Sequence, residues 1–304
     1  MTSIPDWLRP LYPFTPCSFT TPRGARLSYL DEGGAGASEA VLMLHGNPTW
    51  SFYYRNLVKT LAPRLRCIVP DHIGMGLSDK PHDYPYTLET RIADIAALVA
   101  HLGLKRVHLV VHDWGGAIGF GFAARQPELI GRIVILNTGA FPSPSIPARI
   151  ALCKTRFPGT ALVRGLNGFA GPAVWMAMAR RSLNALEKRA YLLPYDSWAN
   201  RVAVDTFVKD IPMNDGHPSW PALKAVEAGI VRFKDNPVLI IWGGRDFCFH
   251  DAFYAEWRQR LPGSDAHYLA DAGHYVLDDA SEEVLPRLVS FFAVNSASSV
   301  KLAE

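Results

Sequence analysis

One ten-residue stretch, residues 107–116, constrains the fold of this chain more than any other. It reads VHLVVHDWGG: an apolar run, a histidine and an aspartate, then a tryptophan and two glycines. A helix-forming run follows over residues 117–125. This order predicts a buried strand, a sharp turn at Asp113 and a helix start, where Gly115 and Gly116 let the two backbones approach. Such a corner is a typical position for a nucleophile, although the usual residue there is serine.

Strand and helix patterns alternate on both sides of this corner. Residues 17–30 read as a hairpin, and Ser51 is a plausible N-cap for the first helix. Short apolar strands like these are typical of a parallel sheet covered on both faces, so the sequence predicts an α/β fold with a mostly parallel sheet flanked by helices. Strands are expected at 41–44, 67–70, 107–111, 133–136, 237–242 and 265–269, and helices at 51–61, 87–101, 117–125, 250–261 and 281–293.

The alternation stops after Asn137. Residues 141–217 show helical segments without a convincing strand, and a proline-rich run opens them at 141–147. We therefore expect a helical cap at 141–217, inserted between two parts of a core domain at 1–140 and 218–304. Most aromatic and methionine side chains of this region belong to the core, and some are expected to line an apolar slot beneath the cap: Phe169, Trp175, Met176, Met178, Phe207 and, just after it, Trp220.

Composition excludes several classes of partner. The 31 basic and 28 acidic residues give a net charge of +3 without a basic block, which argues against nucleic-acid binding. No apolar run reaches the roughly 20 residues that span a bilayer. The four cysteines form no C-x-x-C pair, and the first residues lack the pattern of a signal peptide, so we expect a reduced, cytoplasmic setting. Five prolines at 5–22 predict an extended arm, either a surface wrap or an oligomer contact.

Three residues form a candidate catalytic set, because active sites of such sheets lie at the carboxyl ends of strands. Asp113 is either a helix N-cap or the nucleophile, and its context favours the nucleophile. His274 follows the last predicted strand, after nucleophile and acid in chain order. Asp246 follows the strand at 237–242 and fits the acid that orients the histidine, since Asn137 offers no carboxylate. The rival histidines are His45, which more plausibly shapes its loop, His72, and His112, whose side chain should point away from Asp113.

An aspartate changes the chemistry of this corner. Its unperturbed pKa of about 3.9 leaves it ionised at neutral pH. Attack on an acyl carbon would give a labile anhydride, whereas displacement at a saturated carbon gives an ordinary alkyl ester on Asp113. His274, oriented by Asp246, would then activate water against this ester, and the backbone N–H groups of Trp114 and Asn47 would bind the oxyanion.

The side chains of Asn47 and Trp114 narrow the leaving group. Both offer neutral N–H donors that suit a halide or a small developing oxyanion. The alternative roles are core packing for Trp114 and a loop cap for Asn47. The substrate classes that fit are an alkyl halide, an epoxide or a strained lactone.

Four motifs together resemble the haloalkane dehalogenases of the α/β-hydrolase superfamily: HGNPTW at 45–50, PDHIGMGLSD at 70–79, HDWGG at 112–116 and GH at 273–274. The combination of Asp113, His274 and Asp246 with Asn47 and Trp114 is similar to the family's third subgroup. That subgroup includes the β-lactone decarboxylases of bacterial olefin biosynthesis, whose caps resemble residues 191–198 and 210–212. The resemblance implies no cofactor, no metal and a homo-oligomer.

The leading expectation is hydrolytic dehalogenation of a small apolar substrate, with an alcohol and a halide ion as products. The alternative is decarboxylation of a cis-β-lactone to a long-chain alkene and CO₂ at the same site. An epoxide hydrolase that uses Tyr191 or Tyr195 as an acid fits less well. A non-catalytic binding module is disfavoured, because it has no need of Asp113, Asp246 and His274 together.

Overall fold

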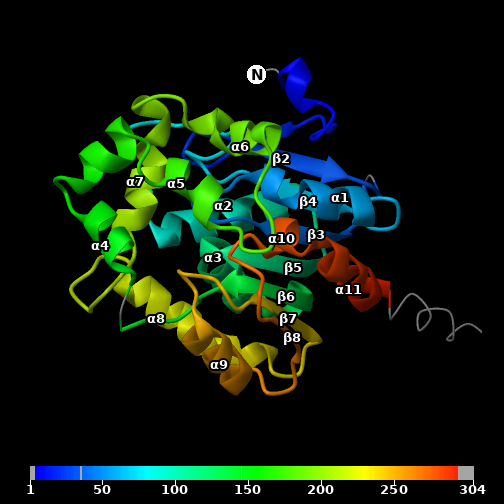
Figure 1. Cartoon of the computed structure of the whole chain (residues 1–304). Helices are drawn as coiled ribbons and strands as arrows, with labels where there is room; N and C mark the ends of the chain where they lie inside the picture. Colours follow the sequence, from blue (N-terminus) through cyan, green and yellow to red (C-terminus); the bar gives the residue numbers. More distant parts are fainter. Residues whose placement is uncertain (1–3, 35, 145, 294–304) are drawn as a thin grey trace, which may run out of the picture.

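An eight-stranded sheet forms the centre of the molecule (Figure 1). The computed structural model describes residues 4–34, 36–144 and 146–293. Its strands are β1 (Cys17–Thr20), β2 (Arg26–Glu32), β3 (Glu39–Leu44), β4 (Cys67–Pro70), β5 (Arg106–Asp113), β6 (Ile130–Thr138), β7 (Val238–Gly243) and β8 (Asp265–Leu269). They lie in the order β1-β2-β4-β3-β5-β6-β7-β8, where β2 is antiparallel to its neighbours and every other pair is parallel. The α/β fold predicted from the sequence is confirmed, including the hairpin.

Helices cover both faces of this sheet. On one face α3 (Trp114–Arg125) packs against α2 (Leu88–His101) and α8 (Trp220–Gly229), and on the other α1 (Arg55–Leu61) contacts α11 (Ser281–Ala293). Successive strand residues point to opposite faces. Accordingly, Leu42 and Leu109 belong to one buried apolar cluster, while Met43 and Val110 belong to the other. Burial on both sides explains why these strands are unbroken apolar runs.

Two further helices, α9 (Asp251–Arg260) and α10 (Val276–Asp279), complete the core.

The local sequence determines where helix α2 begins. Thr87 caps α2 by accepting the N–H of Thr90, as its position before the apolar repeat predicts. Among the described residues no helix is both long enough and apolar enough to cross a membrane.

The segment between β6 and β7 is helical. It contains α4 (Ala148–Lys154), a π-helical turn (Ala161–Gly165), α5 (Ala170–Met176), α6 (Ala185–Leu192) and α7 (Val202–Lys209), which gather at the upper left of Figure 1. No strand occurs there within residues 139–144 and 146–237. Because the next helix, α8, packs against α3 of the core, we propose that the cap spans 141–217.

The N-terminal arm packs against its own chain. The ring of Tyr12 lies 5.2 Å from that of Trp50, and its hydroxyl hydrogen-bonds to Ser51 Oγ at 2.6 Å. Ser51 is therefore not the N-cap that the sequence suggests. The helical turn starts after Trp50, and the N–H of Ser51 donates to the buried carboxylate of Asp71 at 2.7 Å. A distant carboxylate thus takes the role of a local cap.

Candidate active site

The strand-to-helix corner places Asp113 in a strained backbone conformation. β5 ends at Asp113, whose φ is 52° and ψ −128°, and α3 begins at the next residue. Such a conformation persists only where its surroundings enforce it. A Cβ on Gly115 would lie 1.9 Å from the carbonyl oxygen of Leu44, and one on Gly116 would lie 1.9 Å from the hydroxyl oxygen of Thr138. The two glycines therefore allow the close approach of α3 to β3 and β6 that the sequence motif predicts.

The two carboxylate oxygens of Asp113 have different surroundings. Oδ1 accepts the backbone N–H groups of Asn47 and Trp114, both at 2.7 Å. Oδ2 lies 3.6 Å from Nε2 of His274. Burial raises the pKa of Asp113, and His274 and the two N–H groups oppose this effect. Oδ1 is thus held by two donors of the type that stabilise an oxyanion, while Oδ2 faces His274.

His274 is oriented by Asp246. Its Nδ1–H donates to Asp246 Oδ2 at 2.7 Å, and Asp246 Oδ1 accepts the backbone N–H groups of Cys248 (2.7 Å) and Phe249 (3.1 Å). Burial tends to lower the pKa of His274, but the charges of Asp246 and Asp113 outweigh it, so that pKa is raised above its usual value. The structure therefore brings together the three residues that the sequence selected from the ends of separate strands.

Asn137 is a member of this arrangement that the sequence did not identify. Its side-chain N–H donates to Asp246 Oδ2 and to the carbonyl oxygen of Gly243, each at 3.0 Å, and its Oδ1 accepts the N–H of Gly243 at 2.8 Å. It lies at the end of β6, and its φ of 31° is one that asparagine tolerates better than most residues. The only signal in the sequence was a polar residue at the end of an apolar strand.

The rival histidines have other partners. His45 donates to the Gly46 carbonyl and accepts the N–H of His72, so it shapes the loop as expected. His112 donates to the carbonyl oxygen of His274 at 2.9 Å, and its ring stacks on Tyr53. Burial lowers the pKa of His45 to about 4 and that of His112 well below its usual value, so both are neutral.

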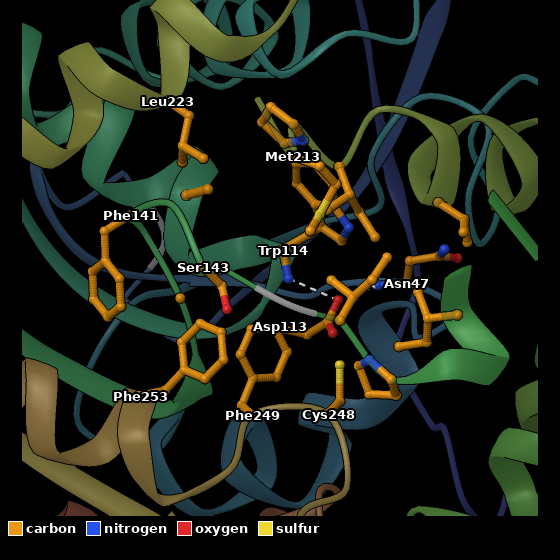
Figure 2. Close-up of a pocket in the computed structure, with 18 of the residues that line it drawn as sticks. Asn47, Asp113, Trp114, Phe141, Ser143, Met213, Leu223, Cys248, Phe249 and Phe253 are labelled. Atoms are coloured by element: carbon orange, nitrogen blue, oxygen red, sulfur yellow. Dashed lines mark hydrogen bonds between the residues drawn. The ribbon is translucent and has the colours of Figure 1, made fainter. Parts of the chain in front are cut away.

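Asn47 and Trp114 both line a cavity in front of Asp113 (Figure 2). The Asn47 side-chain nitrogen donates to the carbonyl oxygen of Val204 at 3.1 Å, and because an amide carries two N–H bonds, the second stays available. The Trp114 ring packs edge-on against Phe207 at 5.4 Å. Among the described residues, no acceptor binds the Trp114 indole N–H.

The cavity is mostly apolar. It is lined by Asn47, Asp113, Trp114, Ala117, Gly139, Phe141, Ser143, Ile146, Pro147, Ile150, Phe169, Val208, Ile211, Pro212, Met213, Leu223, Cys248, Phe249 and Phe253. Phe249 and Cys248 stand on one side of Asp113 and Met213 on the other (Figure 2). Burial raises the pKa of Cys248 well above its usual value, so its thiol stays protonated and Asp113 is the anionic group. An apolar pocket with one anion suits an uncharged substrate.

The cap segment supplies much of the cavity lining, but mostly through residues other than those named from the sequence. Phe169 lines the cavity as predicted, whereas Trp175 is 69% exposed and faces solvent. Tyr191 and Tyr195 are buried outside the cavity lining, and their hydroxyls donate to Asp278 (2.6 Å) and to the Thr49 carbonyl (3.2 Å). The geometry therefore does not favour the epoxide hydrolase in which either tyrosine is the acid. Within residues 4–34, 36–144 and 146–293, no cluster of three histidine, cysteine, aspartate or glutamate side chains could hold a metal ion.

Comparisons with known proteins agree with this fold. The alpha/beta hydrolase fold family matches residues 39–281. The cis-3-alkyl-4-alkyloxetan-2-one decarboxylase of Shewanella oneidensis is 45% identical over 296 residues, which cover 93% of this chain and 92% of that protein. The protein of the same name from Xanthomonas campestris is 43% identical over 94% of this chain and 98% of its own length.

Haloalkane dehalogenases are more distant. Haloalkane dehalogenase 2 of Mycobacterium bovis is 27% identical and covers 93% of this chain and 96% of its own length. The crystal structure of a haloalkane dehalogenase from Bradyrhizobium elkani is 27% identical, with a TM-score of 0.81 over 92% of this chain and 99% of that one. The chain therefore belongs to the α/β-hydrolase fold family, as an enzyme related to haloalkane dehalogenases and to β-lactone decarboxylases.

Proposed function

We propose that this enzyme decarboxylates cis-β-lactones with alkyl groups on both ring carbons, forming an alkene and CO₂. The observation that carries this proposal is the 45% identity, over nearly the whole chain, to a protein named for that reaction. The comparisons thus favour the alternative from the sequence over dehalogenation, whose named relatives include proteins of 27% and 31% identity over 93% and 88% of this chain. The apolar cavity in front of Asp113 suits such an uncharged, dialkylated ring.

In the first step Asp113 would open the ring. Its Oδ2 attacks the saturated carbon that bears the ring oxygen, and the carbon–oxygen bond breaks with its electron pair going to that oxygen. The product is an alkyl ester on Asp113 whose neighbouring carbon carries a free carboxylate. The side-chain donors of Asn47 and Trp114 would bind this new carboxylate in place of a halide.

In the second step the carboxylate leaves as CO₂. The electron pair of the carbon–carboxylate bond forms the alkene, and the ester bond breaks with its pair returning to Asp113. The negative charge of the adduct's carboxylate thus returns to the carboxylate of Asp113, and no water is consumed. Inversion during ring opening followed by anti elimination gives a cis alkene from a cis lactone. The two N–H groups on Oδ1 would stabilise Asp113 as it departs.

Dehalogenation is a second candidate, carried by the same donors in front of Asp113. A halide would occupy the site of Asn47 and Trp114, and water activated by His274 would hydrolyse the ester to an alcohol. The distance of 3.6 Å between His274 Nε2 and Asp113 Oδ2 leaves His274 close enough to direct a water molecule at the ester.

The deciding experiment offers the purified enzyme a long-chain cis-β-lactone and a bromoalkane in parallel. We expect cis alkene and CO₂ from the lactone at a kcat/KM at least about 10²-fold above that for bromide release, within the usual range of enzyme efficiencies. Bromide release without alkene would contradict the proposal. The Asp113→Asn variant is the control for non-enzymatic loss of CO₂.

The pH dependence separates the two reactions further. Asp113 attacks only when ionised, and because burial raises its pKa, alkene formation should fall as pH drops through a midpoint above about 4. Ester hydrolysis also needs neutral His274, whose raised pKa should place the loss of bromide turnover above about pH 6.5. We expect alkene formation to persist to lower pH than bromide turnover in rate profiles of both substrates. If both rates fell over the same acidic pH range, this assignment of roles to Asp113 and His274 would be contradicted.

We further propose that the enzyme is a cytoplasmic homo-oligomer. Support for oligomerisation comes from large apolar side chains exposed on the cap segment, among them Phe157 (82%), Leu166 (77%) and Trp175 (69%). Exposed apolar side chains mark a contact surface where they gather into a patch. Light scattering should give a mass at least twice that of the 33.6 kDa chain, and the mass of a single chain would contradict this proposal.

A further inference from the structure

Two neighbouring carboxylates just after His274, Asp278 and Asp279, bind different partners. Asp278 Oδ2 accepts from the side chains of Arg55 (3.0 Å) and Tyr191 (2.6 Å). Asp279 is 2% exposed, and its carboxylate binds backbone N–H groups. The two residues share burial and position, so a difference between their variants reports on their partners.

The Asp279 carboxylate joins two segments that are far apart in the sequence. Its Oδ2 accepts the N–H of Gly273 at 2.6 Å and that of Ala179 at 2.9 Å. Its Oδ1 accepts the N–H groups of Arg180 at 3.0 Å and Arg181 at 3.2 Å. Gly273 directly precedes His274, whereas residues 179–181 lie between α5 and α6 of the cap. One carboxylate therefore ties the histidine loop to the cap.

The residue after His274 is tied to the same segment. The N–H of Tyr275 donates to the carbonyl oxygen of Ala177 at 2.9 Å. The two backbones are so close that a Cβ on Gly273 would lie 2.6 Å from that oxygen. Both neighbours of His274 thus depend on cap residues 177–181 for their position.

Small shifts of this loop would matter for the reaction. The His274 side chain faces four titratable groups. Asp246 lies 2.7 Å from Nδ1 and Asp113 lies 3.6 Å from Nε2, and the other two are the rings of His112 and Tyr275. The distance from His274 Nε2 to Asp113 Oδ2 is longer than a hydrogen bond, so no direct bond fixes it. A displacement of the His274 loop therefore changes this distance. Misplacement of a reacting group by 1 Å can cost about 10²-fold in rate.

We propose that Asp279 is a positioning residue that locks the His274 loop to cap segment 177–181, so that placement of the cap and placement of His274 against Asp113 are one event. The inference rests on the proposed catalytic role of His274. Asp279 contacts no reacting atom and acts through Gly273. Its loss should loosen the loop against the cap, where the bond from Tyr275 to Ala177 remains, without removing any group of the site.

The test compares Asp279→Asn with Asp278→Asn, the matched control that breaks side-chain contacts to Arg55 and Tyr191 and leaves Gly273 untouched. The first readout follows His274 directly, by NMR titration of ¹⁵N-labelled histidine with the His274→Gln variant for assignment. We expect the His274 midpoint to move to lower pH in Asp279→Asn, since a looser loop weakens its contact with Asp246, and to stay at the wild-type value in Asp278→Asn. This readout needs no substrate, so it stands even if the lactone is not the substrate.

The second readout is the turnover of a bromoalkane, because hydrolysis of its ester on Asp113 is the step that needs water activated by His274. We expect Asp279→Asn to lower kcat about 10-fold or more, with KM changed less than about threefold, because positioning rather than binding is lost. An unchanged His274 midpoint in Asp279→Asn, or equal midpoint shifts in both variants, would show that Asp279 only stabilises the fold.

If Asp279→Asn fails to fold, Ala179→Pro provides the same test from the cap side. It removes one N–H donor to Asp279 and leaves residues 271–279 unchanged. The same downward move of the His274 midpoint is expected, and a wild-type midpoint in this variant overturns the proposal.

Discussion

Asp113→Asn should lower kcat for alkene formation by at least about 10⁴-fold, because removal of a nucleophile leaves only binding and the backbone donors. The variant should unfold at a temperature no lower than the wild type. Burial raises the pKa of Asp113, which means that its charged form is disfavoured in the folded protein, and the neutral amide removes that cost. Thermal unfolding and steady-state kinetics on the same sample check both parts.

Asp71→Asn is the matched control for this variant. Asp71 is also a buried carboxylate that accepts backbone N–H groups, those of Ser51 and Leu77, but it lies outside the cavity lining. The activity of the Asp71→Asn variant should fall only in proportion to any loss of folded protein. Intact mass must show that the introduced asparagine has not reverted to aspartate by deamidation. Turnover near the wild-type rate by verified Asp113→Asn enzyme would exclude covalent attack by this residue.

His274→Gln should distinguish the two candidate reactions, with an effect on bromide turnover comparable to that of Asp113→Asn on alkene formation. With a bromoalkane, bromide release should stop after about one equivalent per active site, and the alkyl ester on Asp113 should accumulate as added mass, since general-base catalysis of the hydrolysis contributes about 10²–10⁴-fold. With the lactone, alkene formation should slow but continue past one equivalent, because CO₂ loss regenerates Asp113 without water.

His108→Gln is a suitable control, since His108 lies on the same strand as Asp113 and pairs with Glu39 away from the cavity. It should turn over both substrates normally. Complete loss of alkene formation in His274→Gln, with an ester trapped from the lactone, would mean that His274 is required for the second step, against the route proposed above.

Local patterns predicted the fold correctly, and they also selected the candidate catalytic set. The strand ending at Asp113, the paired glycines and the loop histidine each depend on neighbours within a few residues. The order of nucleophile, acid and histidine along the chain then selected Asp246 and His274. The structure places these side chains within hydrogen-bond or ion-pair range of one another. Their catalytic roles stay predictions until the variants are measured.

Contacts between distant segments could not be predicted in the same way. Asn137 binds Asp246 across 109 residues of sequence, and Asp71 replaces the expected cap at Ser51. Trp175 was a plausible pocket residue because apolar periodicity predicts a buried face without saying what covers it, and here it faces solvent. The choice between lactone and halide lies equally beyond pattern reasoning, since both leaving groups suit the donors of Asn47 and Trp114.

Because the two carboxylate oxygens of Asp113 have different surroundings, the isotope content of this residue after turnover can distinguish the two reactions. Oδ1 is held by two backbone donors, so Oδ2 forms the ester and is the oxygen lost whenever water cleaves it. Turnover in H₂¹⁸O should therefore leave Asp113 isotopically unchanged if CO₂ loss regenerates it, and should label the peptide containing Asp113 if hydrolysis does. Mass spectrometry of that peptide therefore shows which reaction has taken place, and no product needs to be detected.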